Sequence, residues 1–265
     1  MTADSPAPTP NGRPRIEVVD LDMAYGDFVI QRNLNFTVRP AEIFVVMGGS
    51  GSGKSTLLRH LIGLKAPARG DVLFDGKSLW TAAPSEREEM MRRVGVVYQS
   101  NALWSSLTLS ENVALLLEEF TDLGEQDIRD AVSLKLALVG LAGFEDFYPS
   151  EVSGGMEKRA ALARALALDP EILFLDEPSA GLDPISARLL DDLILDLRDG
   201  LGTTVVVVTH DLASIQTIGD NAVFLDSESK TMMAQGHPKA LLADPPNARV
   251  KAFLTREPIT RMAAP

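Results

Sequence analysis

A run of glycine and serine residues ending in Lys54-Ser55 is the most chemically specific feature of the sequence. Residues 48–55 fit the pattern G-x-x-x-x-G-K-[ST], and they lie between an apolar run at 42–47 and a helical pattern at 55–64. Glycines let successive N–H groups turn toward one anion, the Lys54 ammonium reaches the β- and γ-phosphates, and the Ser55 hydroxyl binds Mg²⁺. A plain flexible turn, the alternative, gives no reason for Lys-Ser after a buried strand. The expected phosphate-binding residues are Gly48, Gly49, Ser50, Gly51, Ser52, Gly53, Lys54, Ser55 and Thr56.

Two neighbouring carboxylates, Asp176 and Glu177, follow another short apolar run at 172–175. That run predicts a buried strand, and an open α/β sheet presents its ligand groups where such strands end. Asp176 suits a place beside Mg²⁺. Glu177 suits the orientation and deprotonation of an attacking water, because phosphoryl transfer needs a positioned nucleophile and neutralised charge. The alternative is that both carboxylates cap the next loop, and the phosphate loop upstream favours the first interpretation.

With these two motifs in place, Val152-Ser-Gly-Gly-Met156 resembles the signature motif of ABC-type ATPases, at the expected position before the Asp-Glu strand. The resemblance covers nearly all of residues 16–242. It implies ATP and Mg²⁺ as cofactors and a homodimer in which Ser153, Gly154 and Gly155 contact the nucleotide held by the second protomer. ATP then joins the two halves, and hydrolysis lets them open.

The resemblance also assigns roles to four weaker positions. It implies that Tyr25 stacks on adenine, that Gln99 is the Q-loop glutamine, that Asp183 ends the D-loop and that His210 is the switch histidine. Judged singly, they fit plainer roles: a turn aromatic, a solvated strand end, a helix cap and a structural histidine. Their joint order along the chain favours the family roles. The implied catalytic residues are thus Glu177, His210 and Gln99, and the implied Mg²⁺ ligands are Ser55, Gln99 and Asp176.

Two departures from the common family pattern narrow the resemblance to one subfamily. Met156 stands where many relatives carry glutamine, and the phosphate loop lacks the proline or arginine often found after its first glycine. Together with residues 99–112 and 183–186, these features are similar to the ATPase subunits of MCE-type lipid-transport systems. The implied partners are transmembrane permease subunits and an MCE-domain lipid-binding protein. The alternatives are an ABC transporter subunit for another cargo and a soluble ABC protein acting on ribosomes or DNA. A GTPase is disfavoured because no Asn-Lys-x-Asp motif occurs.

The elements that must position these residues form an alternating α/β pattern. Residues 16–23, 28–31 and 34–38 predict an antiparallel β layer, and residues 107–168 have helical spacing without a convincing strand. Pro184 opens a helix that we expect to end at Gly200, with a buried stripe of Leu189, Leu190, Leu193, Ile194 and Leu197. Further buried strands are predicted at residues 42–47, 72–74, 94–98, 172–175, 205–208 and 222–226.

The expected fold is therefore α/β, and the resemblance makes it a P-loop NTPase of the ABC ATPase type. It has a mainly parallel central sheet, an N-terminal antiparallel β layer and an inserted α-helical subdomain. The expected organisation is a disordered tail at 1–15, an ATPase domain at 16–245 with its helical insertion at about 101–168, and a C-terminal extension at 246–265.

Composition excludes several classes of protein. Acidic residues outnumber basic ones 37 to 25, for a net charge of −12, whereas nucleic-acid binders usually carry a basic excess. The lack of cysteine excludes disulfide frameworks, thiolate nucleophiles and cysteine-based metal centres. No stretch approaches the ~18 to 20 consecutive apolar residues that a spanning helix needs. We therefore expect no nucleic-acid partner and no membrane-spanning helix. The resemblance implies a cytoplasmic subunit, peripheral on the inner face of the cell membrane through its permease.

Overall fold

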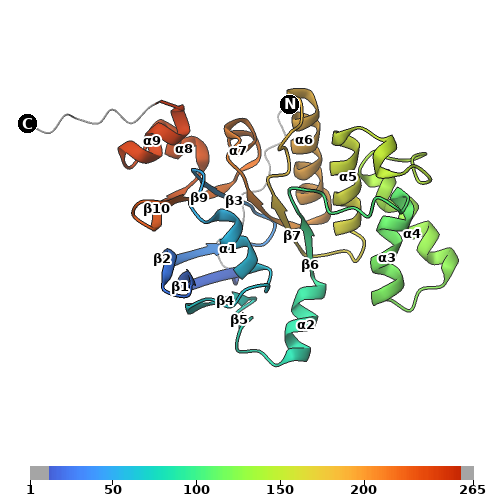
Figure 1. The fold of residues 1–265 in the computed structure, drawn as a ribbon, viewed down its shortest axis with the longest axis horizontal. Helices are drawn as coiled ribbons and strands as arrows, with labels where there is room; N and C mark the ends of the chain where they lie inside the picture. Colours follow the sequence, from blue (N-terminus) through green and yellow to red (C-terminus); the bar gives the residue numbers. More distant parts are fainter. Residues whose placement is uncertain (1–11, 258–265) are drawn as a thin grey trace, which may run out of the picture.

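The computed structural model describes residues 12–257. Most of the predicted tail at 1–15 and the end of the predicted extension at 246–265 therefore lie outside the described residues. The described chain forms a central sheet flanked by helices, with a smaller sheet below it and a helical arm at the right of Figure 1. No helix within this range combines the length and the apolar character needed to cross a bilayer.

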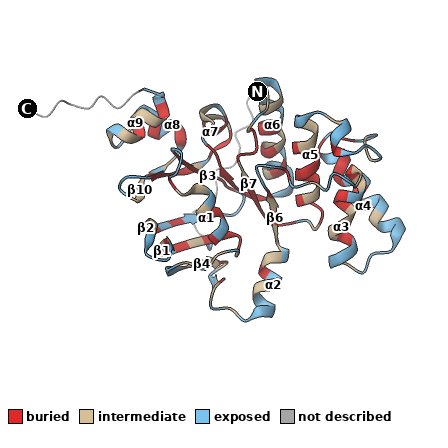
Figure 2. Ribbon diagram, viewed as in Figure 1, coloured by how far each residue is buried: buried red, intermediate tan, exposed pale blue. Residues whose placement is uncertain are grey.

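The central sheet has six strands in the spatial order β10-β9-β3-β8-β7-β6. All neighbours are parallel except β10, which is antiparallel to β9. The strands are rich in branched and aromatic residues and largely buried, because helices cover both faces (Figure 2). Their bounds are β3 (Ile43–Gly48), β6 (Val94–Val97), β7 (Ile172–Asp176), β8 (Thr204–Val208), β9 (Asn221–Asp226) and β10 (Thr231–Gly236). The mainly parallel sheet is as predicted, but β10 was not expected.

The N-terminal layer is a second, antiparallel sheet in the order β2-β1-β4-β5. Its strands are β1 (Ile16–Tyr25), β2 (Phe28–Val38), β4 (Arg69–Phe74) and β5 (Lys77–Ser78). The antiparallel layer is confirmed, but the predicted break between residues 31 and 34 is wrong. Asn33 takes a left-handed φ of 51°, and the register between β1 and β2 shifts there instead of ending. The turn-prone residues thus make a bulge inside one strand.

Helices pack on both faces of the central sheet. The helices of the described residues are α1 (Lys54–Leu61), α2 (Pro84–Arg92), α3 (Leu109–Phe120), α4 (Glu125–Leu138), α5 (Gly154–Ala165), α6 (Pro184–Leu201), α7 (Leu212–Ile218), α8 (Pro238–Ala243) and α9 (Ala248–Thr255). The arm consists of α3, α4 and α5, and its core continues into the sheet. On α6, Leu190, Ile194 and Leu197 are buried as expected, but Leu189 is 58% exposed. The helix also runs past Gly200 to a left-handed cap at Gly202.

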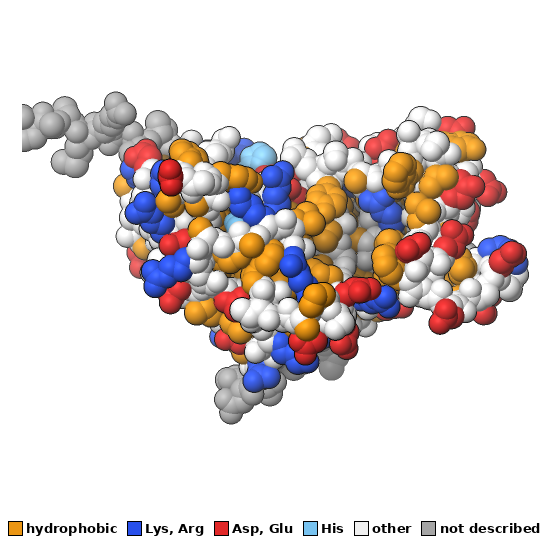
Figure 3. Space-filling model, turned by 60° about the horizontal axis from the view of Figure 1, so that its bottom comes forward, with side chains coloured by type: hydrophobic (Ala, Val, Ile, Leu, Met, Phe, Trp, Pro, Cys, Tyr) orange, Lys and Arg blue, Asp and Glu red, His pale blue; other side chains and the backbone are white. Residues whose placement is uncertain are grey.

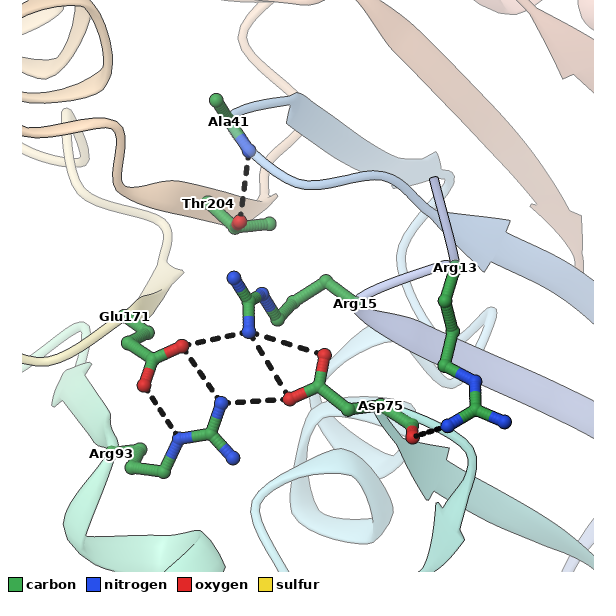
Figure 4. Close-up of polar contacts among 7 residues, drawn as sticks. All are labelled: Arg13, Arg15, Ala41, Asp75, Arg93, Glu171 and Thr204. Atoms are coloured by element: carbon green, nitrogen blue, oxygen red, sulfur yellow. Dashed lines mark hydrogen bonds and ion pairs between the residues drawn. The ribbon is translucent and has the colours of Figure 1, made fainter. Parts of the chain in front are cut away.

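Charged side chains join the N-terminal layer to the edge of the central sheet where β6 and β7 begin (Figure 4). Arg15 contacts Asp75 at 3.1 Å and Glu171 at 2.7 Å, and Arg93 contacts the same two carboxylates at 2.7 Å each. Arg13 adds a hydrogen bond to the Asp75 carbonyl oxygen. Arg93 lowers the pKa of the Glu171 carboxyl, so the carboxylate stays ionised. We call these residues the arginine–carboxylate cluster.

Candidate nucleotide-binding site

The phosphate loop connects the end of β3 to the start of α1, as the sequence predicts. Two of its glycines are required by geometry. A Cβ on Gly48 would collide with the Leu225 carbonyl oxygen of the neighbouring strand. Gly53 has a φ of 90°, and a Cβ there would lie 2.6 Å from the Ile30 side chain. Larger residues at these positions would displace the loop from β9 and β2.

The buried side-chain amide of Gln31, which the sequence did not reveal, holds the phosphate loop in place. Gln31, on β2, is fully buried, and its Nε2 donates to the Ser52 carbonyl oxygen (2.7 Å) and to the Asp226 carbonyl oxygen (2.8 Å). The N-terminal layer, the phosphate loop and β9 therefore meet at one side chain. The available signal was a glutamine at an inward-facing position of a predicted strand, which requires buried hydrogen-bond partners.

The Lys54 ammonium lies over the loop. Its Nζ donates to the carbonyl oxygens of Gly48 (2.9 Å) and Gly49 (3.2 Å). Burial lowers the pKa of Lys54, and the nearby carboxylates of Glu177 and Asp176 partly oppose this effect. The Lys54 ammonium is partly buried and bonded to neutral carbonyl groups, so a nearby anion would stabilise its charge. The loop is therefore suited to bind phosphate.

Asp176 is the last residue of β7, and its carboxyl lies near the Ser55 side chain at the start of α1. Burial raises the pKa of Asp176, the neighbouring Glu177 charge adds to this, and Lys54 and Ser55 oppose it. Its Oδ1 is buried and has no hydrogen-bond partner among residues 12–257. A hard cation would satisfy that oxygen, and Mg²⁺ typically takes one or two carboxylates together with substrate phosphates. No cluster of three or more His, Cys, Asp or Glu side chains that could hold a metal ion occurs in the described range.

Glu177 is held in a strained and well-defined position directly after β7. Its backbone has a left-handed φ of 47°, and its side chain is buried. The Thr209 hydroxyl donates to Glu177 Oε2 (3.2 Å), and His210 Nδ1 donates to Oε1 (2.7 Å). The His210 side chain is 68% exposed. The structure thus brings together two of the predicted catalytic residues, with Thr209 as an additional contact that the sequence did not reveal.

Gln99, by contrast, is exposed, and within the described chain its side chain makes no hydrogen bond with Ser55 or Asp176. Its carbonyl oxygen accepts from the buried Lys158 Nζ (2.7 Å). Asn101 and Ala102 follow in left-handed conformations. Their carbonyl oxygens accept from the Arg164 guanidinium at 2.9 and 2.6 Å. Side chains of α5 therefore fix the backbone of the loop that carries Gln99.

The predicted signature residues form the N-terminus of α5. Ser153 caps the helix by accepting from the Met156 N–H (3.3 Å), and within the described residues neither it nor Gly154 or Gly155 bonds to the phosphate loop. Asp183 caps α6 through the N–H groups of Ile185 (3.0 Å) and Ser186 (3.1 Å). The plainer role considered for Asp183, a helix cap, is therefore present in the structure.

Tyr25 ends β1 beside α1. Its hydroxyl accepts from Arg59 Nη1 (3.4 Å), and Lys65 Nζ lies 3.0 Å from its ring centroid. A groove of about 320 Å³ adjoins the phosphate loop on the same side as β2. Its lining includes three residues that the sequence did not single out: Phe28, Ile30 and Lys230. The groove and the loop together offer room for a nucleotide, with the phosphates on the loop.

Comparison with known proteins agrees with this geometry. The family model described as "ABC transporter" matches residues 31–180. Over 242 residues, the chain is 41% identical to the "Intermembrane phospholipid transport system ATP-binding protein MlaF" of Haemophilus influenzae, covering 91% of this chain and 90% of that protein. The Escherichia coli K12 protein of the same name is 40% identical, with coverage of 90% and 88%. The "Probable ribonucleotide transport ATP-binding protein mkl" of Mycobacterium tuberculosis is also 40% identical, and the chain spans 66% of its length.

The fold of this chain matches the folds of solved ABC transporter proteins. The cbiO1 protein of Clostridium perfringens, part of the ABC transporter complex cbiONQ, has a TM-score of 0.81 at 29% identity, covering 88% of this chain and 92% of that one. The cassette MJ0796, solved as a dimer in a post-hydrolysis state with ADP and Pi, has a TM-score of 0.76 at 29% identity, covering 84% and 98%. The predicted fold is thereby confirmed.

Proposed function

Because this chain belongs to the ABC transporter family, as an ATP-hydrolysing cassette, we propose that it powers phospholipid transport between membranes through a separate permease. The observation that carries the ATPase part is Glu177, held by Thr209 and His210 next to the phosphate loop. Similarity to the MlaF proteins over about nine tenths of both chains supports the lipid cargo. The alternative is another cargo, as the name of the mycobacterial relative indicates for that protein.

ATP binding starts from the phosphate loop. The loop N–H groups and the N-terminus of α1 face the phosphates, and the Lys54 ammonium exchanges its carbonyl partners for phosphate oxygens. Ser55 and Asp176 would hold Mg²⁺, which when bound neutralises charge on the β- and γ-phosphates. Gln99 is proposed to complete this site from its own loop, since its side chain is solvent-exposed and unengaged by Ser55 and Asp176 in the described chain.

Hydrolysis needs a base that holds one water in line with the γ-phosphate. The Glu177 carboxylate is suited to this role because Thr209 and His210 restrict its orientation before any nucleotide binds. The bond from His210 Nδ1–H to Oε1 leaves Nε2 without a hydrogen-bond partner among the described residues, and Nε2 can donate to the γ-phosphate when it also carries a proton. Glu177 would accept a proton from the attacking water. His210 would contact both the γ-phosphate and the Glu177 carboxylate and so link the two.

The complete site needs a second copy of the chain. Ser153, Gly154 and Gly155 form a helix N-terminus that makes no hydrogen bond to the phosphate loop within the described part of its own chain. Such a terminus is suited to receive the γ-phosphate held by a second protomer, with Asp183 near the junction. The dimeric state of the MJ0796 cassette with ADP and Pi supports this arrangement.

Coupling to the permease is proposed at the surface around Trp104. Trp104 is 63% exposed, so it is not a core residue. The fully buried Asn112 brackets the Trp104 backbone, since its Oδ1 accepts from the N–H (2.7 Å) and its Nδ2 donates to the carbonyl oxygen (3.0 Å). An anchored backbone with a solvent-facing indole is suited to a protein contact.

A groove whose lining does not include Trp104 gives the described chain a second candidate docking surface. It has a volume of about 560 Å³ and is lined by the end of α1, by α2 and by β6. Figure 3 shows apolar side chains gathered around a hollow between the body of the molecule and the arm. We therefore propose a peripheral position at the inner face of the cell membrane, on permease subunits that also engage an MCE-domain lipid-binding protein.

Two measurements test the proposal. Lys54→Ala should abolish ATP turnover while leaving the melting temperature near wild type, because Lys54 bonds only to loop carbonyls. Turnover near the wild-type rate in this variant would contradict the ATPase site. For the cargo, we expect the chain to co-purify with a permease from membranes and the reconstituted complex to raise its ATPase rate with phospholipid. A response to amino acids or metal ions but not to phospholipid would overturn the cargo and leave the ATPase intact.

A further inference from the structure

We propose that Lys65 is a positioning residue for the purine base: its ammonium covers one face of the Tyr25 ring and leaves the opposite face as the stacking platform. This inference rests on the proposed binding of ATP with its base near Tyr25. The family resemblance supplies a role for the aromatic ring only. The cation beside it is a feature of this structure.

The contact itself is close and well oriented. Lys65 Nζ lies 3.0 Å from the centroid of the Tyr25 ring, over its face. Tyr25 is nevertheless 47% exposed, and Lys65 occupies one face of its ring, so a base would have to stack on the opposite face. An ammonium over an aromatic face is attracted by the negative potential of the ring, and this attraction opposes rotation of the side chain.

Lys65 is held in place through its backbone. The fully buried His60 donates from Nδ1 to the Lys65 carbonyl oxygen at 2.5 Å, and the Lys65 N–H donates to the Arg59 carbonyl oxygen at 3.1 Å. Burial lowers the pKa of His60, so the ring remains neutral with its proton on Nδ1. The residue that covers Tyr25 is therefore anchored from the core.

A third contact fixes the rim of the ring. Arg59, on α1, donates from Nη1 to the Tyr25 hydroxyl at 3.4 Å. Tyr25 is thus held at its face by Lys65 and at its hydroxyl by Arg59, from α1 and the turn that follows it. The same helix begins with Lys54 at the phosphate loop, and Arg59 follows about 8 Å along the axis. One rigid element therefore sets both the phosphate position and the base platform.

A ring that is already oriented loses less freedom when a base stacks on it, which strengthens binding without a new contact to the ligand. The cation also withdraws electron density from the ring face toward itself. Its removal should weaken binding of any ligand that carries a base. A ligand that consists of phosphates alone should not be affected, because both Lys65 and Tyr25 lie outside the lining of the groove beside the phosphate loop.

The test is isothermal titration calorimetry of the full chain with Mg²⁺ and two probes, the non-hydrolysable imido analogue of ATP and inorganic tripolyphosphate. Lys65→Ala should raise the Kd for the imido analogue about two- to fivefold, the range of one exposed cation–aromatic contact, and leave tripolyphosphate unchanged. Lys65→Arg should restore the wild-type value. Lys77→Ala, at an exposed lysine on β5, is the matched control and should change neither Kd.

The decisive comparison is made in a Tyr25→Ala background. There, Lys65→Ala should have no further effect on the imido analogue. An equal loss with and without Tyr25, or a loss for tripolyphosphate, would overturn the proposal, because Lys65 would then act on the phosphates. A lower Kd in Lys65→Ala would also overturn it, since the ammonium would then occupy the face that the base needs. Failure of the proposed function would give a different result, because both probes would then still bind to the Lys54→Ala variant.

Discussion

Replacing Asp191 by asparagine should stabilise the chain at neutral pH. Asp191 lies on the inward side of α6 and is only 5% exposed. It accepts one hydrogen bond, from the Ser214 hydroxyl at 3.0 Å. Burial raises its pKa from 3.8 to about 6, and the nearby Asp211 charge adds to the shift while the Ser214 bond opposes it. Asparagine keeps an acceptor for Ser214 and removes the buried charge.

The size of the effect follows from the two pKa values. The shift is about 2 pKa units, and each unit corresponds to 1.36 kcal/mol, so ionised Asp191 costs the folded state about 3 kcal/mol. The sign follows from proton binding. Between pH 3.8 and about 6 the unfolded carboxyl has lost its proton while the folded one retains it, so the free energy of unfolding falls as pH rises. The full cost is present above pH ~6, and about half of it at pH 5.

The assay is urea unfolding of the wild type and of Asp191→Asn from pH 5 to 7.5, followed by circular dichroism. The variant should be more stable throughout, by about 1.5 kcal/mol at pH 5 and by about 3 kcal/mol at pH 7.5. Asp192→Asn is the matched control, because Asp192 is half-exposed and pairs with Arg188 along the helix, an interaction of at most ~0.5 kcal/mol. A gain that does not grow with pH, or a variant less stable than the wild type at pH 7.5, would refute the reasoning.

Three further predictions concern the site. Glu177→Gln should keep ATP binding and lower turnover by ~10²–10⁴-fold, the range for loss of a general base, and size-exclusion chromatography with ATP and Mg²⁺ should show a trapped dimer; turnover within tenfold of wild type would count against Glu177 as the base. Gln31→Ala should lower the free energy of unfolding by about 1–3 kcal/mol, because the Ser52 and Asp226 carbonyl oxygens lose their donor; an unchanged urea midpoint would contradict the role given to this amide. Trp104→Ala should weaken capture of the permease and leave the Kd for ATP of the isolated chain near wild type, whereas unchanged capture would exclude the docking role.

The parts of the site that the sequence predicted are those whose chemistry is local. The phosphate loop depends on a contiguous strand, glycine run and helix, and the structure confirms that order at β3 and α1. Asp176 and Glu177 follow a continuous apolar strand, so their place at the C-terminal end of that strand was also predictable. Each inference required only the residues on either side of the motif.

The parts that were missed depend on contacts between distant segments. Gln31 lies 195 positions from Asp226, and nothing near residue 31 marks that partner. Strand β10 has a mixed composition, Thr-Met-Met-Ala-Gln-Gly, because it pairs at the edge of the sheet and is only partly buried. Helical spacing alone placed Leu189 in the buried stripe. The buried face of α6 is narrower than that stripe and leaves Leu189 exposed. Tertiary packing decides such features, and local pattern does not contain it.

The arginine–carboxylate cluster has a consequence for the order in which a ribosome can complete this molecule. Arg15 is synthesised before its partner Glu171, which lies 156 positions later in the chain. At a synthesis rate of ~5–20 residues per second, the two are made roughly 8–30 s apart. The hairpin of β1 and β2 is local and can pair at once, whereas the ion pair between Arg15 and the residue before β7 must wait for Glu171. Throughout that interval the N-terminal layer lacks the Glu171 half of its charged anchor, so the arginine–carboxylate cluster is completed only after Glu171 has been synthesised.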